Sequence, residues 1–358
     1  MSVMDLYRDY RLPWMQSGKE SDIVISSRVR LARNFSRLPF PNRADFTQLA
    51  AVQEMAASIF SDLESACNEE FDAIGMDALT PLERSVLVEK QLISRNLIKK
   101  PQYRSVYVSH DRRCSVMVNE EDHLRIQCMA AGLDLTAPFA LASRMDDAVE
   151  AKLDIAFDEK MGYLTSCPTN LGTGLRASVL LHLPGLVFTR NMNNIINISQ
   201  QLGLSVRGMY GEGTETVGNV FQVSNQLTLG FTEQGILDNL TSAVKEIIEN
   251  ERRARKALML YNKDRMDDVV WRAFGTLKYA RFIGETEVLQ LLSKVRLGID
   301  LGLINEAMPE QYPELILASR PSYLQNLMNN ENMSKNEIDR KRAEMVRRIL
   351  AGESAGQE

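Results

Sequence analysis

Hydrophobic and polar residues alternate along several stretches of the first two thirds of the chain. Residues 22–34 begin with this alternation, and residues 103–130 contain three alternating segments rich in β-branched residues, separated by charged turns. Residues 220–231 predict two more strands around an asparagine turn. Because alternation with a period of two is typical of half-buried strands, we expect an antiparallel sheet.

Other stretches repeat their apolar residues at the spacing of an amphipathic helix. In the first part of the chain these stretches are residues 46–65, 145–157 and 236–260. Beyond residue 255 the predicted elements are all helical, as in residues 285–304 and 334–352. Ile338, Met345 and Ile349 mark the apolar stripe of the last helix.

These patterns predict an α+β fold, in which an antiparallel sheet flanked by helices is followed by an all-helical C-terminal domain. We expect the mixed domain over residues 1–254 and the helical domain over residues 255–350. Residues 351–358 are small and polar, and we expect a disordered tail there.

Composition narrows the class of protein. The chain has 358 residues, 44% of them hydrophobic and 25% charged, with a net charge of −5, which argues against a general nucleic-acid binder. No apolar run approaches the roughly 20 residues of a membrane span, and the start of the chain is charged, so we expect a cytoplasmic protein. Four cysteines without CxxC spacing predict neither a disulfide framework nor a zinc site.

Common catalytic motifs are absent from the sequence. It contains no GxxxxGK[ST], no GxGxxG that follows a strand, no HExxH and no GxSxG. Of three histidines, only His123 has polar neighbours of interest, which weakens the hypothesis of a cysteine–histidine hydrolase.

Arginines occur instead in unusual settings. Arg28 and Arg30 share one face of a predicted strand, and Arg125, Arg176 and Arg207 come from three other segments. The planar guanidinium matches the geometry of phosphate oxygens, so convergence of these arginines would suit a polyphosphate. The alternative is that each one is an ordinary surface or ion-paired arginine.

Five segments carry a resemblance to a known family. They are "SSRVRLARN", "VNEEDHLRI", "CPTNLGTGLRAS", "VRGMYGEGTE" and "VFQVSNQLTLG". In this order they resemble the signature segments of the phosphagen (guanidino) kinases, and most closely those of its bacterial branch, the protein-arginine kinases. The resemblance implies that residues 1–254 form the catalytic domain, with ATP and Mg²⁺ as cofactors and no metal site made by the protein alone.

The resemblance also implies roles for particular residues. Glu121 and Glu212 correspond to the carboxylates that hold the substrate guanidinium, and Cys167 to the reactive cysteine beside it. The implied nucleotide-binding residues are Ser26, Ser27, Arg28, Val29, Arg30, Arg125, Arg176, Ala177, Ser178, Val179, Leu180, Arg207, Gly208, Met209, Tyr210, Gly211 and Glu212. One departure is Gln91, where the family often has a histidine.

The residue types suit phosphoryl transfer to a guanidinium. Arginines neutralise the charge of the transferred group, and two glutamates can orient the acceptor and take its proton. We expect Cys167 to be an ionised electrostatic partner rather than a covalent nucleophile, because cationic neighbours lower the pKa of a thiol. The glycines of "NLGTG" are expected to let the backbone approach the nucleotide and to deliver Arg176.

The acceptor is expected to be an arginine displayed on a protein. Small-molecule relatives carry a helical domain before the first motif, whereas here that motif begins at Ser26, so we expect an open acceptor side. The alternatives are a small-molecule guanidino kinase and a non-catalytic adaptor that binds phosphoarginine. The resemblance further implies a homodimer, an activator protein and Clp-type protease machinery as partners.

The helical tail resembles the part of the family that binds phosphoarginine through a motif close to Arg-Asp-x-x-Arg-Ala. Asp339, Arg342 and Ala343 match this motif, but Ile338 stands where the first arginine is expected. The alternative is that the segment is only the solvated basic face of a helix.

Overall fold

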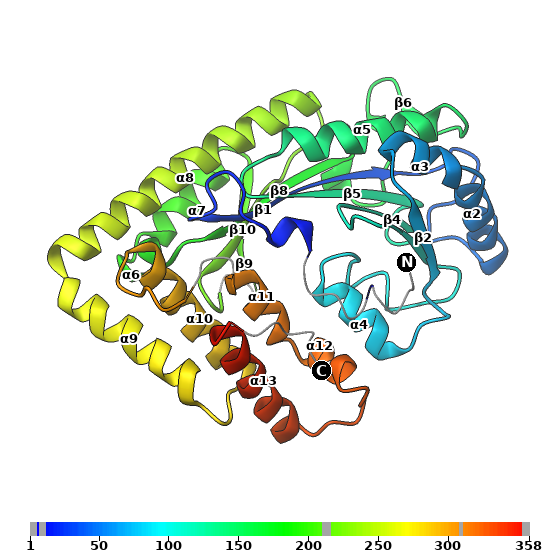
Figure 1. The fold of residues 1–358 in the computed structure, drawn as a ribbon. Helices are drawn as coiled ribbons and strands as arrows, with labels where there is room; N and C mark the ends of the chain where they lie inside the picture. The colour runs from blue at the N-terminus through cyan, green and yellow to red at the C-terminus, as the bar shows by residue number, and fades with distance from the viewer. Residues whose placement is uncertain (1–5, 7–11, 210–215, 308–310, 353–358) are drawn as a thin grey trace.

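The computed structural model describes residues 6, 12–209, 216–307 and 311–352. Within these residues an eight-stranded sheet has the order β2-β3-β4-β5-β1-β8-β10-β9, and every neighbouring pair is antiparallel (Figure 1). The strands are β1 (Val24–Arg33), β2 (Phe71–Gly75), β3 (Ser105–Ser109), β4 (Cys114–Val118), β5 (Leu124–Ala131), β8 (Leu175–His182), β9 (Leu204–Gly208) and β10 (Val220–Asn225). The predicted antiparallel sheet is thus confirmed.

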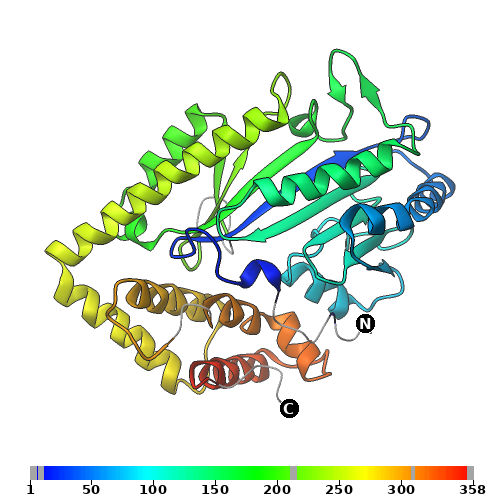
Figure 2. The same ribbon diagram turned by 45° about the horizontal axis from the view of Figure 1, so that its top comes forward.

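Helices cover one face of this sheet, with α5 and α8 lying across it (Figure 2). The α-helices of this part are α2 (Phe46–Ser58), α3 (Phe60–Cys67), α4 (Pro81–Glu89), α5 (Thr136–Glu150), α6 (Pro184–Phe188), α7 (Met192–Gln201) and α8 (Glu233–Tyr261). Two short 3₁₀ helices and a small hairpin complete it, namely η1 (Pro13–Met15), η2 (Pro168–Asn170), β6 (Phe157–Asp158) and β7 (Gly162–Tyr163).

Three predicted elements differ from the structure. The helix expected over 46–65 is broken at Ile59, which leaves helical geometry and separates α2 from α3. The helix expected over 145–157 begins earlier and ends at Glu150. The second strand expected within 220–231 does not form, because the Thr228 hydroxyl donates to the carbonyl of Leu171 (2.6 Å) and holds this segment against the 169–172 loop.

The C-terminal helices form a second unit with its own apolar core. They are α9 (Lys263–Tyr279), α10 (Glu285–Asp300), α11 (Gln311–Ala318), α12 (Pro321–Leu327) and α13 (Lys335–Leu350). Met345 and Ile349 are buried in this core and Ile338 packs against it, as the apolar stripe predicted. The domain boundary predicted after residue 254 falls within α8, which continues to Tyr261.

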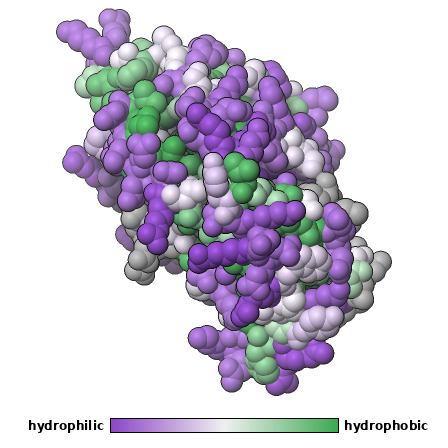
Figure 3. Space-filling view, turned by 90° about the vertical axis from the view of Figure 1, so that its left-hand side faces the viewer, coloured by the Kyte–Doolittle hydropathy of each residue, from purple (hydrophilic) through white to green (hydrophobic). Residues whose placement is uncertain are grey.

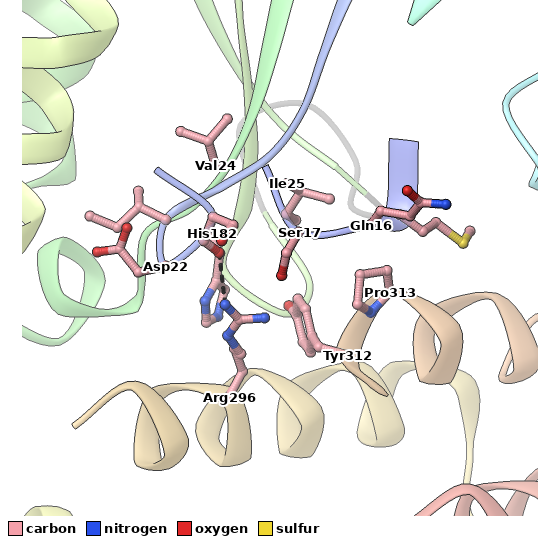
Figure 4. A pocket seen from close by; sticks show the side chains of 12 residues that line it. Gln16, Ser17, Asp22, Val24, Ile25, His182, Arg296, Tyr312 and Pro313 are labelled. Atoms are coloured by element: carbon pink, nitrogen blue, oxygen red, sulfur yellow. Dashed lines mark hydrogen bonds between the residues drawn. The ribbon is translucent and has the colours of Figure 1, made fainter. Parts of the chain in front are cut away.

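Buried polar contacts fasten the helical unit to the sheet. Asp300 at the end of α10 accepts from Arg296 (2.9 Å) and Arg255 (3.2 Å). Ser293, also on α10, is 2.8 Å from the Nε2 of His182 at the end of β8. Figure 4 shows Arg296 and Tyr312 reaching from the helical unit toward His182, around a small cavity of about 30 Å³. The two units are therefore held by specific interactions and not by apolar contact alone.

The face seen from the left of Figure 1 carries mostly hydrophilic side chains with smaller hydrophobic areas between them (Figure 3). Among the described residues, no helix combines the length and the apolar character that a membrane crossing requires.

Candidate active site

The central strand β1 positions the first two arginines of the candidate site. In the antiparallel register, Arg30 lies directly opposite Arg176 of β8, and Arg28 lies opposite Ser178. Arg125 of β5 pairs with Ala32 on the other side of β1. Side chains alternate between the two faces of a strand, so these arginines share the face opposite the helix-covered core.

This face borders a cavity of about 340 Å³, which we call the arginine cavity. It is lined by Arg28, Arg30, Leu31, Ala32, Glu120, Glu121, Asp122, Arg125, Cys167, Asn170, Gly174, Arg176, Arg207 and Gln222. The five predicted arginines, Glu121 and Cys167 therefore come together, although they belong to four separate segments of the sequence.

The other described residues predicted to bind the nucleotide are not in the lining of this cavity, and Val29, Ala177 and Val179 belong to the apolar core. Ser26, Ser27 and Val29 belong to β1, and the hydroxyl of Ser27 is buried and donates to the carbonyl of Gly132 (2.7 Å). Four residues continue β8 beyond Arg176, namely Ala177, Ser178, Val179 and Leu180. Gly208 ends β9 and Met209 follows it. Tyr210, Gly211 and Glu212 lie outside the described residues.

Positive charge is concentrated on the arginine face. Burial, together with the charges of Arg125 and Arg176, lowers the pKa of Arg28 to about 9. Burial and the charges of Arg28, Arg125 and Arg176 likewise lower the pKa of Arg30 well below its ordinary value. Like charges placed directly opposite each other on neighbouring strands are destabilising. An anion in the cavity would relieve this repulsion.

The Nε of Arg30 is buried and has no hydrogen-bond partner within the part of the chain that the structure describes. Buried donors are rarely left unpaired in proteins, so this one indicates a ligand acceptor. Arg28 donates to Gln222 (2.7 Å), which fixes its guanidinium at the edge of the cavity.

Acidic residues also line the arginine cavity. Glu120 is buried and pairs with Arg125 at 2.9 Å, and the Ser94 hydroxyl donates to it (2.5 Å). Its neighbour Glu121 is exposed. Burial of part of the side chain and the charges of Glu120 and Asp122 raise the pKa of Glu121. A carboxylate with a raised pKa is a better proton acceptor, which suits the role expected of Glu121.

The loop that carries Cys167 is tied to this acidic turn. Asp122 accepts from the backbone amide of Ser166 (2.7 Å) and from the side chain of Asn34 (2.6 Å). Cys167 is half-buried, and its Sγ lies 3.1 Å from the hydroxyl of Thr169. Asp122 thereby holds the segments of Glu121 and Cys167 next to each other.

The glycines of this loop serve contacts within the protein. Gly174 has a φ of +66°, and a Cβ there would meet the side chain of Arg33 at 2.5 Å and the carbonyl of Ala32 at 2.7 Å. A Cβ at Gly172 would meet the backbone of residues 228–229. These glycines permit a close approach to neighbouring backbone and to Arg33, and their expected role in letting the backbone approach a nucleotide stays a prediction.

The sequence interpretation did not assign roles to Glu120, Asp122 or Gln222. Each is a polar residue on or beside a strand, and Gln222 stands between two buried apolar residues of β10. A polar residue within an apolar strand was the feature of the sequence that could have indicated a role for Gln222.

His123, by contrast, is buried, and its Nδ1 accepts from the amide of Phe35 (2.9 Å), so it has a structural role.

The segment that matches the phosphoarginine motif lies in α13. Arg342 is only 2% exposed and donates to the carbonyls of Ser319 (2.6 Å) and Ile283 (2.8 Å) and to Asp339. Ala343 is buried as well. A phosphoryl group would have to replace one of these partners of Arg342, and the phosphoarginine site stays a prediction.

Comparison with known proteins defines the class. The family model described as "ATP:guanido phosphotransferase, C-terminal catalytic domain" matches residues 51–254. The solved structure of lombricine kinase has a TM-score of 0.59 at 23% identity, covering 71% of this chain and 77% of that one, which supports the fold. The duplicated taurocyamine kinase from Schistosoma mansoni also has a TM-score of 0.59, at 25% identity, covering 75% of this chain and 42% of that one. The fold and the catalytic region are those of an ATP:guanido phosphotransferase.

Curated relatives specify the class further. A protein-arginine kinase of Bacillus velezensis is 47% identical over 98% of this chain and 96% of the relative. One of Bacillus subtilis is 46% identical over 99% of this chain and 98% of the relative. A second family model, "Protein-arginine kinase McsB C-terminal domain", matches residues 263–358. The chain belongs to the protein-arginine kinase family, and its reaction is the phosphorylation of arginine in proteins.

Proposed function

We propose that the arginine cavity binds the phosphate chain of ATP, while Glu121 and Cys167 contact the guanidinium of the target arginine. The observation that carries this proposal is that arginines and an exposed carboxylate line the same cavity. Arg28, Arg30, Arg125, Arg176 and Arg207 supply positive charge, and Glu121 lies in the same cavity with only part of its surface buried. Donor and acceptor of a phosphoryl group would therefore meet there.

The chain's own residues would act by positioning and by charge. Phosphoryl transfer passes through a loose transition state, whose charge the arginines would stabilise. The Arg30 Nε would donate to a phosphate oxygen, which satisfies its unpaired hydrogen. Glu121 would orient a guanidinium nitrogen and accept its proton, since a guanidinium must lose a proton to become a nucleophile. Glu212 is proposed as the second carboxylate from the resemblance alone.

Mg²⁺ would enter with the nucleotide. Among the described residues, no group of three or more histidine, cysteine, aspartate or glutamate side chains could hold a metal ion. Mg²⁺ commonly binds substrate phosphates and waters with few protein ligands, so the arginine cavity fits a metal carried by ATP. Bound there, it would neutralise charge on the phosphates.

The decisive experiment separates acceptor from donor. Glu121→Gln should lower phosphorylation of an unfolded arginine-containing protein by roughly 10²-fold or more, while ATP affinity changes little. Arg176→Ala should weaken ATP binding and lower the rate together. Phosphoarginine is measured by mass spectrometry under non-acidic conditions, and ATP binding by calorimetry. Equal loss of ATP affinity in both variants would contradict this assignment.

We also propose a cytoplasmic protein that acts as a homodimer with an activator protein and Clp-type proteolysis, as the family resemblance implies. The protein-arginine kinase relatives support protein substrates. Size-exclusion chromatography with light scattering would test the dimer, and co-purification from cells would test the partners.

A further inference from the structure

A second and larger cavity adjoins the arginine cavity. Its volume is about 1140 Å³, and we call it the outer cavity. Arg28 and Gln222 line both cavities, so the two cavities adjoin at these side chains. Glu121 and Cys167 line the arginine cavity and are not in the lining of the outer cavity. The outer cavity therefore opens on the side away from the acceptor groups.

Two different parts of the chain form the walls of the outer cavity. From the sheet-bearing part come Gln91 and several apolar side chains, including Val88, Ile93 and Met209. The helical unit contributes Glu285 of α10, Ser322 of α12 and Arg320, which directly precedes α12. Polar and charged residues make up the larger part of this lining, among them Arg95 and Lys99. Small-molecule sites combine apolar side chains with polar groups that fix the orientation of the ligand.

We propose that the helical unit completes the nucleotide site, with Arg320 and Ser322 bordering the ribose and base of ATP. This inference rests on the proposed binding of phosphates in the arginine cavity. A nucleotide held there by its phosphates must extend its sugar and base into adjoining space. Away from the acceptor, the outer cavity offers that space at Arg28, with apolar side chains for a planar base and polar groups for the sugar.

The wall from the helical unit is fixed in place by α4. The carboxylate of Glu89, the last residue of α4, accepts from the backbone amides of Ser322 (3.1 Å) and Tyr323 (2.8 Å). Arg320 forms an ion pair with Glu285 at 2.5 Å, which connects α12 to α10.

The opposite wall is anchored to the arginine face. Gln91 follows α4 closely and has a φ of +59°, and its carbonyl accepts from Gln127 (2.8 Å). Gln127 lies opposite Arg30 in the sheet. A ligand in the outer cavity would thus touch both units, and its binding would stabilise their docking by thermodynamic linkage.

The experiment compares ATP with inorganic tripolyphosphate, which has the phosphates but neither ribose nor base. Calorimetric titrations of the full chain would use Ser322→Trp, which fills the outer cavity, and Arg320→Gln, which removes a charge from its wall. We expect the Kd for ATP to rise about tenfold in Ser322→Trp and about threefold in Arg320→Gln, with the Kd for tripolyphosphate changed less than about twofold. Arg272→Ala, at an exposed arginine of α9, is the matched control and should change neither Kd.

The possible outcomes separate this inference from the proposed function. Unchanged ATP affinity in both variants, or an equal loss of affinity for both ligands, would overturn the role of the helical unit. If Ser322→Trp fails to fold, judged by thermal denaturation, Arg320→Gln decides. Arg176→Ala tests the proposed function separately, since it should weaken both ligands. If Arg176→Ala binds ATP and tripolyphosphate as tightly as the parent, phosphate binding in the arginine cavity is refuted.

Discussion

At the scale of single residues, the neighbouring arginines of the site lower the stability of the folded protein. Arg30 opposite Arg176 is a like-charge pair that an ordinary sheet avoids, and Arg28 and Arg125 lie close enough to lower the pKa of Arg30 further. One carboxylate, Glu120, pairs with Arg125 in this group. Such an arrangement costs stability in the free enzyme and favours an anionic ligand.

Replacing Arg176 by alanine should therefore stabilise the free enzyme. Removing one of the clustered charges should raise the melting temperature by roughly 2–4 °C, which corresponds to about 1 kcal/mol. The same variant should lose the stabilisation that tripolyphosphate gives the parent. Differential scanning calorimetry measures both, with Arg272→Ala as the control. A lower melting temperature for the ligand-free Arg176→Ala variant would contradict the like-charge argument.

His123 should make stability depend on pH. Burial lowers the pKa of His123 to about 4 from an ordinary value of 6.5. The unfolded chain thus binds the proton more tightly, and the contribution of neutral His123 is complete above pH 6.5 and lost as the pH falls toward 4. This loss is on the order of 3 kcal/mol.

Urea unfolding at pH 7 and pH 4.5 would test this for the parent and for His123→Gln. Burial also lowers the pKa of His182, so the variant should still lose some stability as the pH falls. The free energy of unfolding should consequently fall less in the variant. Identical falls in both proteins would show that His123 is not the source.

At the scale of elements, the sequence predicted strands better than their ends. Alternation identified β1 and the β3–β5 meander, even though β3 and β4 are buried on both faces. It failed after Asn225, where the hydroxyl of Thr228 binds a loop distant in sequence. It also missed the break at Ile59, because an apolar stripe continues through both helices. Contacts between distant segments decide such boundaries.

The same limit applies to the site. The motifs identified the arginines, Glu121 and Cys167, but the spacing of residues could not show that Asp122 joins the loop of Cys167 to the turn of Glu121. Nor could it show that Arg30 faces Arg176, because the pairing of β1 with β8 depends on chain folding across more than 140 residues. The outer cavity depends on the helical unit and has no local signature.

Gly174→Ala should destabilise the loop before β8. A left-handed φ of +66° and a Cβ placed 2.7 Å from the carbonyl of Ala32 both oppose any side chain. We expect a loss of about 1–3 kcal/mol and lower kinase activity, because this loop leads into Arg176. Gly275→Ala is the matched control. Gly275 lies within α9, and a Cβ there would meet no atom within 4 Å apart from the nearby backbone of the helix itself, so the variant should be more stable by roughly 0.5–1 kcal/mol.

Chemical denaturation of both glycine variants would provide these values. A neutral effect at Gly174 would mean that the loop relaxes without cost, and it would remove the steric reason for glycine there.

At the scale of the whole molecule, Asp300 joins the two units. It lies between Arg255 of α8 and Arg296 of α10, with little of any of these side chains exposed. Asp300→Ala would leave two buried cations without this partner, and we expect a loss of about 3–5 kcal/mol. Glu306→Ala, which breaks an exposed pair with Lys278, should cost less than about 1 kcal/mol.

Thermal unfolding followed by calorimetry would compare these two variants. If Asp300→Ala unfolds in two steps, the helical unit has lost its docking before the sheet unfolds. Equal melting temperatures for the two variants would show that the Asp300 contacts contribute no more than a surface ion pair.

The alternation of β1 also restricts how this gene can change. Its neighbours β5 and β8 fix the register on both sides, so a shift of one residue would turn the side chain of Val29 toward the arginine cavity and drive Arg28 and Arg30 into the apolar core. Substitutions within the strand can be tolerated one at a time, but a codon gained or lost there removes the site in a single step. The function should therefore be more sensitive to the length of β1 than to its composition.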